Sequence, residues 1–215
     1  MKTIMILGAT GAVGKALLNF ALLHPEIEHI IAPTRKPLLP HQKLENPIVD
    51  FSDLPQDALC WKCDAVLCAL GTTIADAGSQ KAFFTIDHDY VLNAAKLAHE
   101  AGTPCFIYNS SIGASVNARS FYLQTKGKIE QNLNALHFAS TYHFRPSLLI
   151  ASNRPRFRFG EFFATLFFKL FDSVIPRSYK AIKVEDVAQA MLHEALNPKI
   201  GLHVINSGNI KNLSF

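Results

Sequence analysis

Short apolar runs alternate with longer amphipathic stretches along the whole chain of 215 residues. The short runs are rich in β-branched residues and predict strands, whereas the stretches with a helical period predict helices. The predicted strands are Thr3–Leu7, Glu28–Ala32, Pro47–Asp50, Asp64–Ala69, Cys105–Tyr108, Thr141–Arg145 and Leu202–Ile205. The predicted helices are Ala12–Leu23, Phe83–Glu100, Ser120–Leu136, Glu161–Phe171 and Val184–Ala195. This alternation predicts an α/β fold with a doubly wound parallel sheet of the Rossmann type.

The length of the chain and the lack of linker-like segments predict one domain over residues 1–215. A soft boundary near Ala151–Pro155 follows the sixth strand, so residues 151–215 are expected to form a small C-terminal helical lobe that covers the substrate site. Between Ala32 and Asn46 the chain carries Pro33, Pro37 and Pro40. These prolines favour an irregular crossover over a helix.

Composition narrows the class of protein. With 49% hydrophobic and 18% charged residues the chain resembles a soluble globular protein, and we expect it in the cytoplasm. No apolar run is long enough to span a bilayer. The net charge of +4 is scattered, which speaks against a nucleic-acid partner. Cys60 and Cys63 have the spacing of a redox or zinc pair, but no second pair accompanies them, so we expect reduced thiols and no metal site.

The strongest motif is the glycine turn Gly8-Ala9-Thr10-Gly11-Ala12-Val13-Gly14, directly after the first strand. A dinucleotide pyrophosphate requires this order of strand, turn and helix. Gly8 permits the tight turn, Gly11 lets backbone N–H groups reach the phosphates, and Gly14 lets the helix pack close to the strand. The alternative is a purely structural turn. We expect cofactor contacts from Gly8, Thr10, Gly11, Ala12, Val13 and Gly14.

The second strand ends in Thr34-Arg35-Lys36, without the carboxylate that would hold the ribose of NAD. A guanidinium and an ammonium stand instead where the 2′-phosphate of NADP lies, and arginine suits bidentate phosphate binding. The sequence therefore favours NADP(H) over NAD(H); the alternative is a solvated basic loop. Asp50 and Phe51, at the end of the third predicted strand, are placed beside the adenine.

Tyr122 and Lys126 lie one turn apart on a predicted helix, and Ser111 follows the fifth strand. Such a set suits carbonyl reduction: Tyr122 would transfer the proton, Lys126 would favour its phenolate, and Ser111 would bind the substrate oxygen. By itself the tyrosine–lysine pair is more often a surface contact. Together with the glycine turn it predicts a catalytic role.

In these motifs the chain resembles the short-chain dehydrogenase/reductase (SDR) superfamily, and most of all its atypical NAD(P)H-binding subfamily of HIV Tat-interacting-protein oxidoreductases. The matching segments are Gly8–Gly14, Cys68–Thr73, Asn109–Ser111, Tyr122–Gly127 and Phe144–Pro146. The resemblance implies that Gly71 and Thr72, next to Leu70, border the nicotinamide ribose. It also implies that Lys126 holds the ribose hydroxyls and that Pro146, Ser147 and Leu148 meet the carboxamide.

The chain departs from the superfamily pattern at two points. Many SDR enzymes complete a proton relay with an asparagine on the fourth helix, where this chain offers Asp87 or Asn93. The stretch after the sixth strand is also short for the substrate lobe of a sugar-nucleotide epimerase, which disfavours that activity.

These features favour an NADP(H)-dependent oxidoreductase that acts on a small, fairly apolar carbonyl or alcohol. The alternative is an NADP(H)-sensing binding or regulatory protein with little or no turnover. The phenylalanine-rich segment from Arg154 to Phe171 is expected to cover the substrate cleft. The second interpretation of this segment is a subunit interface, for instance of a homodimer. Membrane docking is less favoured than either of these roles.

Overall fold

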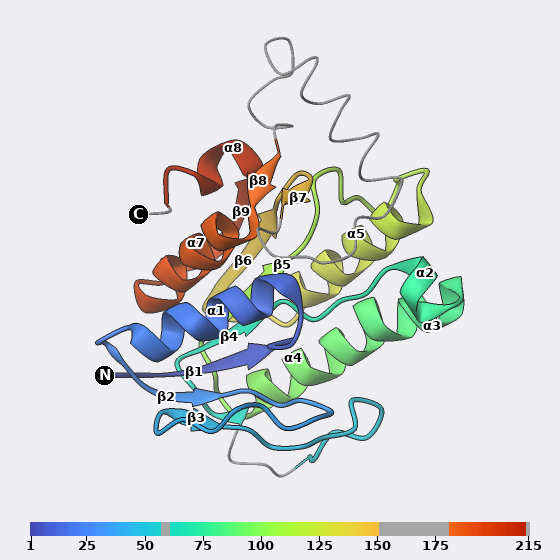
Figure 1. Ribbon diagram of the computed structural model, residues 1–215. Helices are drawn as coiled ribbons and strands as arrows, with labels where there is room; N and C mark the ends of the chain where they lie inside the picture. Colours follow the sequence, from blue (N-terminus) through green and yellow to red (C-terminus); the bar gives the residue numbers. More distant parts are fainter. Residues whose placement is uncertain (57–60, 151–180, 214–215) are drawn as a thin grey trace.

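A seven-stranded parallel sheet forms the centre of the protein in a computed structural model that describes residues 1–56, 61–150 and 181–213 (Figure 1). The strand order is β3-β2-β1-β4-β5-β6-β9, and β7 and β8 form a separate parallel pair. The bounds are β1 Lys2–Leu7, β2 Ile27–Ile31, β3 Leu44–Glu45, β4 Ala65–Cys68, β5 Cys105–Asn109, β6 Ser140–Arg145, β7 Leu149–Ile150, β8 Ile182–Lys183 and β9 Gly201–Asn206.

Helices cover both faces of this sheet because the strands are apolar on both sides. In β1, Ile4 and Ile6 belong to one core, which includes residues of α1 (Ala12–Leu23) and α7 (Val184–Leu196). Met5 and Leu7 belong to the other, with residues of α4 (Tyr90–Glu100) and α5 (Phe121–Asn134). A strand buried on both faces reads as a continuous apolar run, as β1 does. The doubly wound Rossmann fold is therefore confirmed.

Six of the predicted strands are confirmed, but the one over Pro47–Asp50 is wrong. The strand that pairs with β2 comes earlier, at Leu44–Glu45, and only an isolated bridge joins Ile48 to Thr34. Pro47 gives the physical reason, because it has no N–H to donate to a neighbouring strand. Its carbonyl still accepts a hydrogen bond of 3.0 Å from the backbone N–H of Thr34.

The helix predicted over Phe83–Glu100 begins earlier and is interrupted. After the short helix α2 (Ile74–Ala77), α3 (Gln80–Phe84) leads through a π-helical turn at Thr85–Asp89 directly into α4. The hydroxyl of Ser79 caps α3 by accepting from the Ala82 N–H. A π turn inserts an extra residue into a helix and is frequent at functional sites. Here it carries two buried polar residues, Asp87 and His88.

The described part of the C-terminal region packs into the main layers. β9 extends the central sheet beside β6, α7 packs on α1, and α8 (Ser207–Ile210) follows β9 (Figure 1). The expected cover segment, including the predicted helix Glu161–Phe171, lies outside the described residues. In the described ranges, Cys63, Cys68 and Cys105 are free and buried, and no helix is long and apolar enough to cross a membrane.

Candidate active site

Backbone geometry at the turn after β1 requires glycine at two of its three positions. Gly8 has φ +85°, and a Cβ there would lie 2.6 Å from the backbone nitrogen of Leu70. At Gly14 a Cβ would lie 2.0 Å from the Gly8 carbonyl oxygen, so only glycine lets α1 pass this close to the turn. Gly11 is different: its φ is −76°, and a Cβ would meet Gly8 O at 3.4 Å, which ordinary contact allows.

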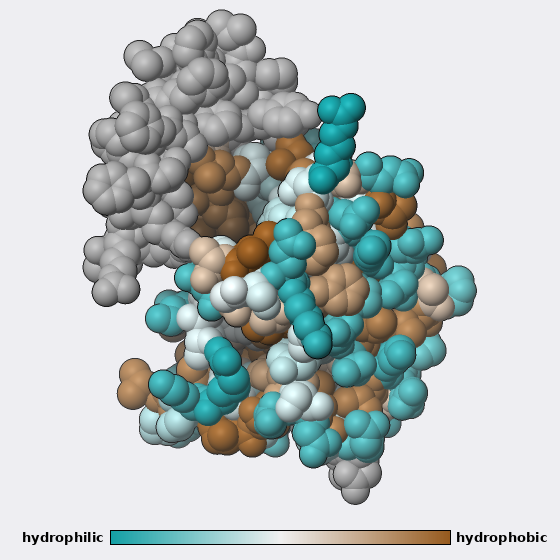
Figure 2. All heavy atoms as spheres, turned by 90° about the vertical axis from the view of Figure 1, so that its right-hand side faces the viewer, coloured by the Kyte–Doolittle hydropathy of each residue, from teal (hydrophilic) through white to brown (hydrophobic). Residues whose placement is uncertain are grey.

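The turn borders a cavity of about 460 Å³ at the carboxyl ends of β1, β2 and β4. In this sheet β1 lies between β2 and β4, where the strand order reverses, and ligands of open α/β sheets bind at such a reversal. The N-terminus of α1 opens onto it, which favours an anionic ligand. Figure 2 looks onto this edge of the sheet, where neutral and hydrophobic residues run down the middle between hydrophilic side chains.

Ten of the residues expected to bind the cofactor line this cavity, although the sequence places them in four separate segments. They are Gly8, Thr10, Gly11, Thr34, Arg35, Asp50, Phe51, Leu70, Gly71 and Thr72. Five further lining residues were not anticipated: Pro33, Ala69, Asp76, Ile86 and Tyr90. The other expected contacts do not line it, namely Ala12, Val13, Gly14, Lys36, Lys126, Pro146, Ser147 and Leu148. The lining fits an elongated anionic group, because glycines at Gly8, Gly11 and Gly71 leave the backbone open to close approach.

One end of the cavity is basic and aromatic. Arg35 is exposed at its edge, whereas Thr34 beside it is buried. Phe51 stacks on Tyr90 with ring centroids 6.2 Å apart, which gives this end a flat apolar wall. The Asp50 carboxylate accepts a 2.9 Å hydrogen bond from the Ser52 N–H, which lowers the pKa of Asp50.

At the other end, Asp87 joins the chain after β4 to helix α5. Its Oδ2 accepts a 2.7 Å hydrogen bond from the Thr72 N–H, and its Oδ1 lies 2.9 Å from Lys126 Nζ. Lys126 also donates a 2.8 Å hydrogen bond to the Tyr108 hydroxyl. A Cβ at Gly71 would lie 3.0 Å from Asp87 Oδ1, so a larger residue there would press on the Asp87 carboxylate. Asn93, the other candidate for the relay position, is exposed on α4.

The charge state of this cluster follows from its neighbours. Burial opposes the charged form of Lys126, but Tyr108 and Asp87 outweigh it and raise the pKa of Lys126 well above its usual value. Burial raises the pKa of Tyr108, so its hydroxyl stays neutral and accepts from the ammonium. The nearby Asp87 carboxylate thus stabilises the charged form of the buried Lys126 ammonium.

The remaining catalytic candidates are Tyr122, whose ring lies beside the Lys126 ammonium, and Ser111. Tyr122 is half-buried, with its ring centroid 5.9 Å from Lys126 Nζ and 5.6 Å from the ring of Phe83. Ser111 is also half-buried, and its hydroxyl makes a long 3.4 Å contact to the Ile112 carbonyl. The structure thus gives Lys126 the direct partners Asp87 and Tyr108 in addition to the neighbouring ring of Tyr122.

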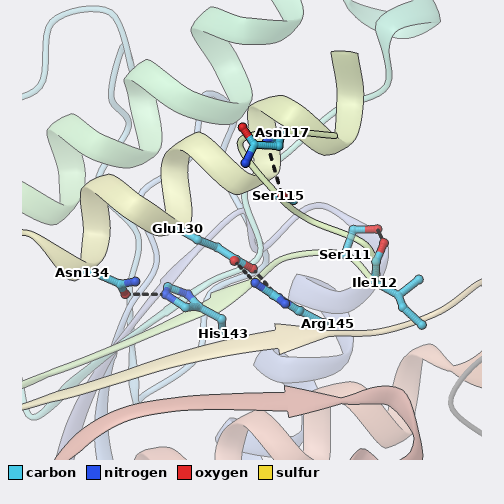
Figure 3. Close-up of polar contacts among 8 residues, drawn as sticks. All are labelled: Ser111, Ile112, Ser115, Asn117, Glu130, Asn134, His143 and Arg145. Carbon is cyan, nitrogen blue, oxygen red and sulfur yellow. Dashed lines mark hydrogen bonds and ion pairs between the residues drawn. The ribbon is translucent and has the colours of Figure 1, made fainter. Parts of the chain in front are cut away.

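Helix α5, which carries Tyr122 and Lys126, is fixed to β6 by two polar contacts. Glu130 accepts from both Nε (3.0 Å) and Nη2 of Arg145, and Asn134 Oδ1 lies 2.7 Å from His143 Nε2 (Figure 3). Burial lowers the pKa of His143 to about 4, so the ring is neutral at physiological pH. The bidentate ion pair holds the helix at a defined distance from the strand end.

The segment after β6 is held by backbone contacts of its own. Pro146 O accepts from Ile112 N (2.9 Å) and Leu148 O accepts from Ile182 N (3.0 Å). Ser147 Oγ lies 2.9 Å from the hydroxyl of Ser207.

Besides the unanticipated lining residues of the cavity, sequence reasoning also missed Tyr108, which contacts Lys126. It stands in a buried strand, where a tyrosine hydroxyl requires a polar partner. That requirement is the one signal that could have linked it to Lys126 on the neighbouring helix.

Known proteins resemble this chain in sequence and in fold, although no protein-family model matches it. Protein HTATIP2 of Rattus norvegicus is 34% identical over 205 residues, covering 93% of this chain and 84% of that protein. Mitochondrial protein FMP52 of Meyerozyma guilliermondii is 33% identical and covers 90% of this chain and 85% of its own length.

Solved structures agree on the architecture. MoeE5 in complex with UDP-glucose and NAD superposes with a TM-score of 0.70 at 17% identity, covering 97% of this chain and 79% of that one. The Bordetella bronchiseptica enzyme WbmH in complex with NAD⁺ superposes with a TM-score of 0.71 at 16% sequence identity. The match covers 99% of this chain and 78% of that one. At this identity the likeness concerns the fold alone. The sequence relatives decide the family: this chain belongs to the family of HTATIP2 and FMP52.

Proposed function

We propose that the protein is an NADP(H)-dependent oxidoreductase that acts on a small, fairly apolar carbonyl or alcohol. The observation that carries this proposal is the 460 Å³ cavity, which runs from the glycine turn and Arg35 to Gly71 and Thr72. Thr72 is tied through Asp87 to Lys126, so the cavity ends next to the proposed catalytic groups. Solved proteins of this fold bind NAD, which supports a nicotinamide cofactor.

In this proposal, residues of the cavity lining and further residues outside it each bind one part of the cofactor. The glycine turn and the first residues of α1, Gly8 to Gly14, would bind the pyrophosphate. Asp50 and Phe51 would flank the adenine. Leu70, Gly71, Thr72 and Lys126 would bind the nicotinamide ribose, and Pro146 to Leu148 the carboxamide.

Arg35 decides the choice between the two cofactors in this proposal. It is the basic side chain that lines the cavity next to the adenine wall, and Lys36 adds positive charge beside it. The described residues that line the same end include one carboxylate, Asp50, whose oxygen is engaged by Ser52. A guanidinium here favours a ribose that carries a 2′-phosphate.

The chemistry assigned to the chain is proton transfer and oxygen binding, and the nicotinamide supplies or accepts the hydride when bound. Tyr122 transfers the proton to or from the substrate oxygen, and Ser111 donates a hydrogen bond to that oxygen. The buried ammonium of Lys126 stabilises negative charge on the Tyr122 oxygen and binds the ribose. Asp87 and Tyr108 hold the ammonium in place.

A second function has one specific observation in its favour. Lys126 is engaged by Asp87 and Tyr108, and its Nζ lies 5.9 Å from the Tyr122 ring centroid. A site in which this arrangement persists after cofactor binding would bind NADP(H) and turn over slowly. That behaviour belongs to a cofactor-sensing regulatory protein.

One experiment separates the two functions. Calorimetry measures NADPH binding, and absorbance at the NADPH band follows turnover with a panel of apolar aldehydes and ketones. Tight binding with turnover on some members supports the enzyme. Tight binding without turnover on the whole panel supports the sensor, and absent NADPH binding contradicts both.

The cytoplasmic localisation stays a prediction, because the FMP52 relatives are named as mitochondrial proteins. Subcellular fractionation of a C-terminally tagged chain checks it. The expected homodimer likewise stays a prediction, which analytical ultracentrifugation checks.

A further inference from the structure

The segment that carries Arg35 is a short arch with a fixed base. After β2 the chain pairs with the last residue of β3 and with the residues that follow it, through Ala32 N to Glu45 O (2.9 Å) and Thr34 N to Pro47 O (3.0 Å). Val49 N returns a bond to Thr34 O (2.9 Å). Residues 35–38 leave this paired region as an arch, which has no helix or strand of its own.

A single side chain, that of Asn46, ties the arch together. Its Nδ2 donates to Ala32 O (2.5 Å) and to Thr34 Oγ1 (2.8 Å), while its Oδ1 accepts from Leu38 N (2.8 Å). The Thr34 hydroxyl in turn donates to Lys36 O (2.7 Å). The amide therefore holds both ends of the arch and, through the Thr34 hydroxyl, its middle.

The network fixes the orientation of both side chains. A flipped Asn46 amide would set its oxygen against the Ala32 carbonyl and its NH₂ against the Leu38 N–H, so one orientation satisfies all partners. The hydrogen of the Thr34 hydroxyl is already donated to Lys36 O. Thr34 lines the cavity, but its hydroxyl hydrogen is therefore not free for a ligand.

We infer that Asn46 is a positioning residue for cofactor specificity: it holds the arch so that Arg35 faces a phosphomonoester on the adenosine ribose. Asn46 does not line the cavity, whereas Arg35 does, so Asn46 acts through the arch. A preorganised arch spares the ligand the cost of ordering it, which strengthens binding without a new contact. The inference rests on the proposed function, because it presupposes a ligand with a 2′-phosphate.

Two small probes isolate the effect of that phosphate. Calorimetry compares adenosine 2′,5′-bisphosphate with AMP, which lacks the 2′-phosphate. Asn46→Ala is expected to weaken bisphosphate binding about 3- to 10-fold, the usual effect of freeing one or two ordered side chains, and to leave AMP binding unchanged. Thr34→Val, which removes the hydroxyl, should show part of the same loss, and Thr34→Ser, which keeps it, should lose less bisphosphate affinity than Thr34→Val.

A double-mutant cycle shows whether Asn46 acts through Arg35. In the Arg35→Ala background, Asn46→Ala should cause no further loss of bisphosphate affinity. Equal weakening of both probes, an unchanged bisphosphate affinity, or a full additional loss in the Arg35→Ala background each overturns the inference.

Failure of the proposed cofactor preference looks different. In that case the wild type binds both probes equally and Arg35→Ala changes neither. If Asn46→Ala does not fold, as judged by circular dichroism, the comparison of Thr34→Val with Thr34→Ser decides between the same outcomes.

Discussion

Lys126 and Asp87 form an ion pair in which Nζ and Oδ1 are 2.9 Å apart and the side chains are only 5% and 1% exposed. The pair joins helix α5 to the π turn before α4, and the Thr72 N–H is bonded to the same carboxylate. A charge buried to this degree is costly without its partner. The site therefore depends on Asp87 for stability as well as for geometry.

The first prediction concerns this ion pair. Asp87→Asn keeps the shape of the side chain but leaves the Lys126 ammonium buried without a counter-charge, so we expect a loss of about 3 kcal/mol in the free energy of unfolding. Urea denaturation measures it. The double variant Asp87→Asn/Lys126→Met removes the unpaired charge and should recover part of the loss. A single variant as stable as the wild type would contradict the account.

The second prediction concerns the cofactor. Arg35→Ala should weaken NADPH binding by about 1–3 kcal/mol, as the loss of a charged hydrogen-bond partner does, and change NADH binding little. Lys36→Ala is the comparison, because Lys36 is also exposed and basic but does not line the cavity, so it should cost less NADPH affinity than Arg35→Ala. Isothermal titration of the wild type and both variants with each cofactor measures the affinities. If NADPH and NADH weaken alike, Arg35 does not read the 2′-phosphate.

The third prediction concerns the glycine turn. At Gly11 a Cβ meets Gly8 O at 3.4 Å and the backbone is extended, so Gly11→Val should fold normally. The branched side chain would occupy the place where the pyrophosphate approaches the backbone, and cofactor binding should be lost. Circular dichroism and calorimetry measure the two effects. The control is Gly8→Val, which should fail to fold because of its φ of +85° and the 2.6 Å approach to Leu70 N. Retained NADPH affinity in Gly11→Val would remove the phosphate-binding role of the turn.

The fourth prediction concerns pH. Burial lowers the pKa of His143 from 6.5 to about 4, so the unfolded chain takes up a proton in this range while the folded protein does not. The contribution of the neutral, buried ring to stability is present above pH 6.5 and is lost as the pH falls through 4, a change of about 3 kcal/mol. His143→Gln keeps a donor for Asn134 without titrating. The difference in unfolding free energy between wild type and variant should shrink as the pH falls from 6.5 to 4. A difference that stays constant would show that His143 is not the titrating group.

The strands and the glycine turn were predictable from sequence because their signals are local. The continuous apolar run of β1 and the glycine spacing after it specify burial on both faces and a tight turn, whatever the rest of the chain does. The strand expected at Pro47–Asp50 failed for a local reason as well, since Pro47 cannot donate to a ladder. A closer reading of that proline would have shifted the strand to Leu44–Glu45.

The partners within the site were harder to predict, because they come from segments far apart in the chain. Tyr108 and Lys126 are 18 residues apart, and Asp87 reaches Lys126 from a π turn that the helical period does not reveal. Asn46 reaches back 14 residues to Ala32, at the base of the arch. Residue types indicated carbonyl chemistry, but only the packing of α5 against β5 shows which group each side chain meets.

The measurement that tests the central claim most directly is the turnover of Tyr122→Phe with NADPH and a carbonyl substrate that the wild type reduces. The change removes one oxygen and leaves the packing on Phe83 nearly intact. Turnover should fall by about 10²- to 10⁴-fold, the usual weight of general acid–base catalysis, while NADPH affinity is unchanged. Lys126→Met should lower both. A Tyr122→Phe enzyme with wild-type turnover would contradict the account and move the proton transfer to another group.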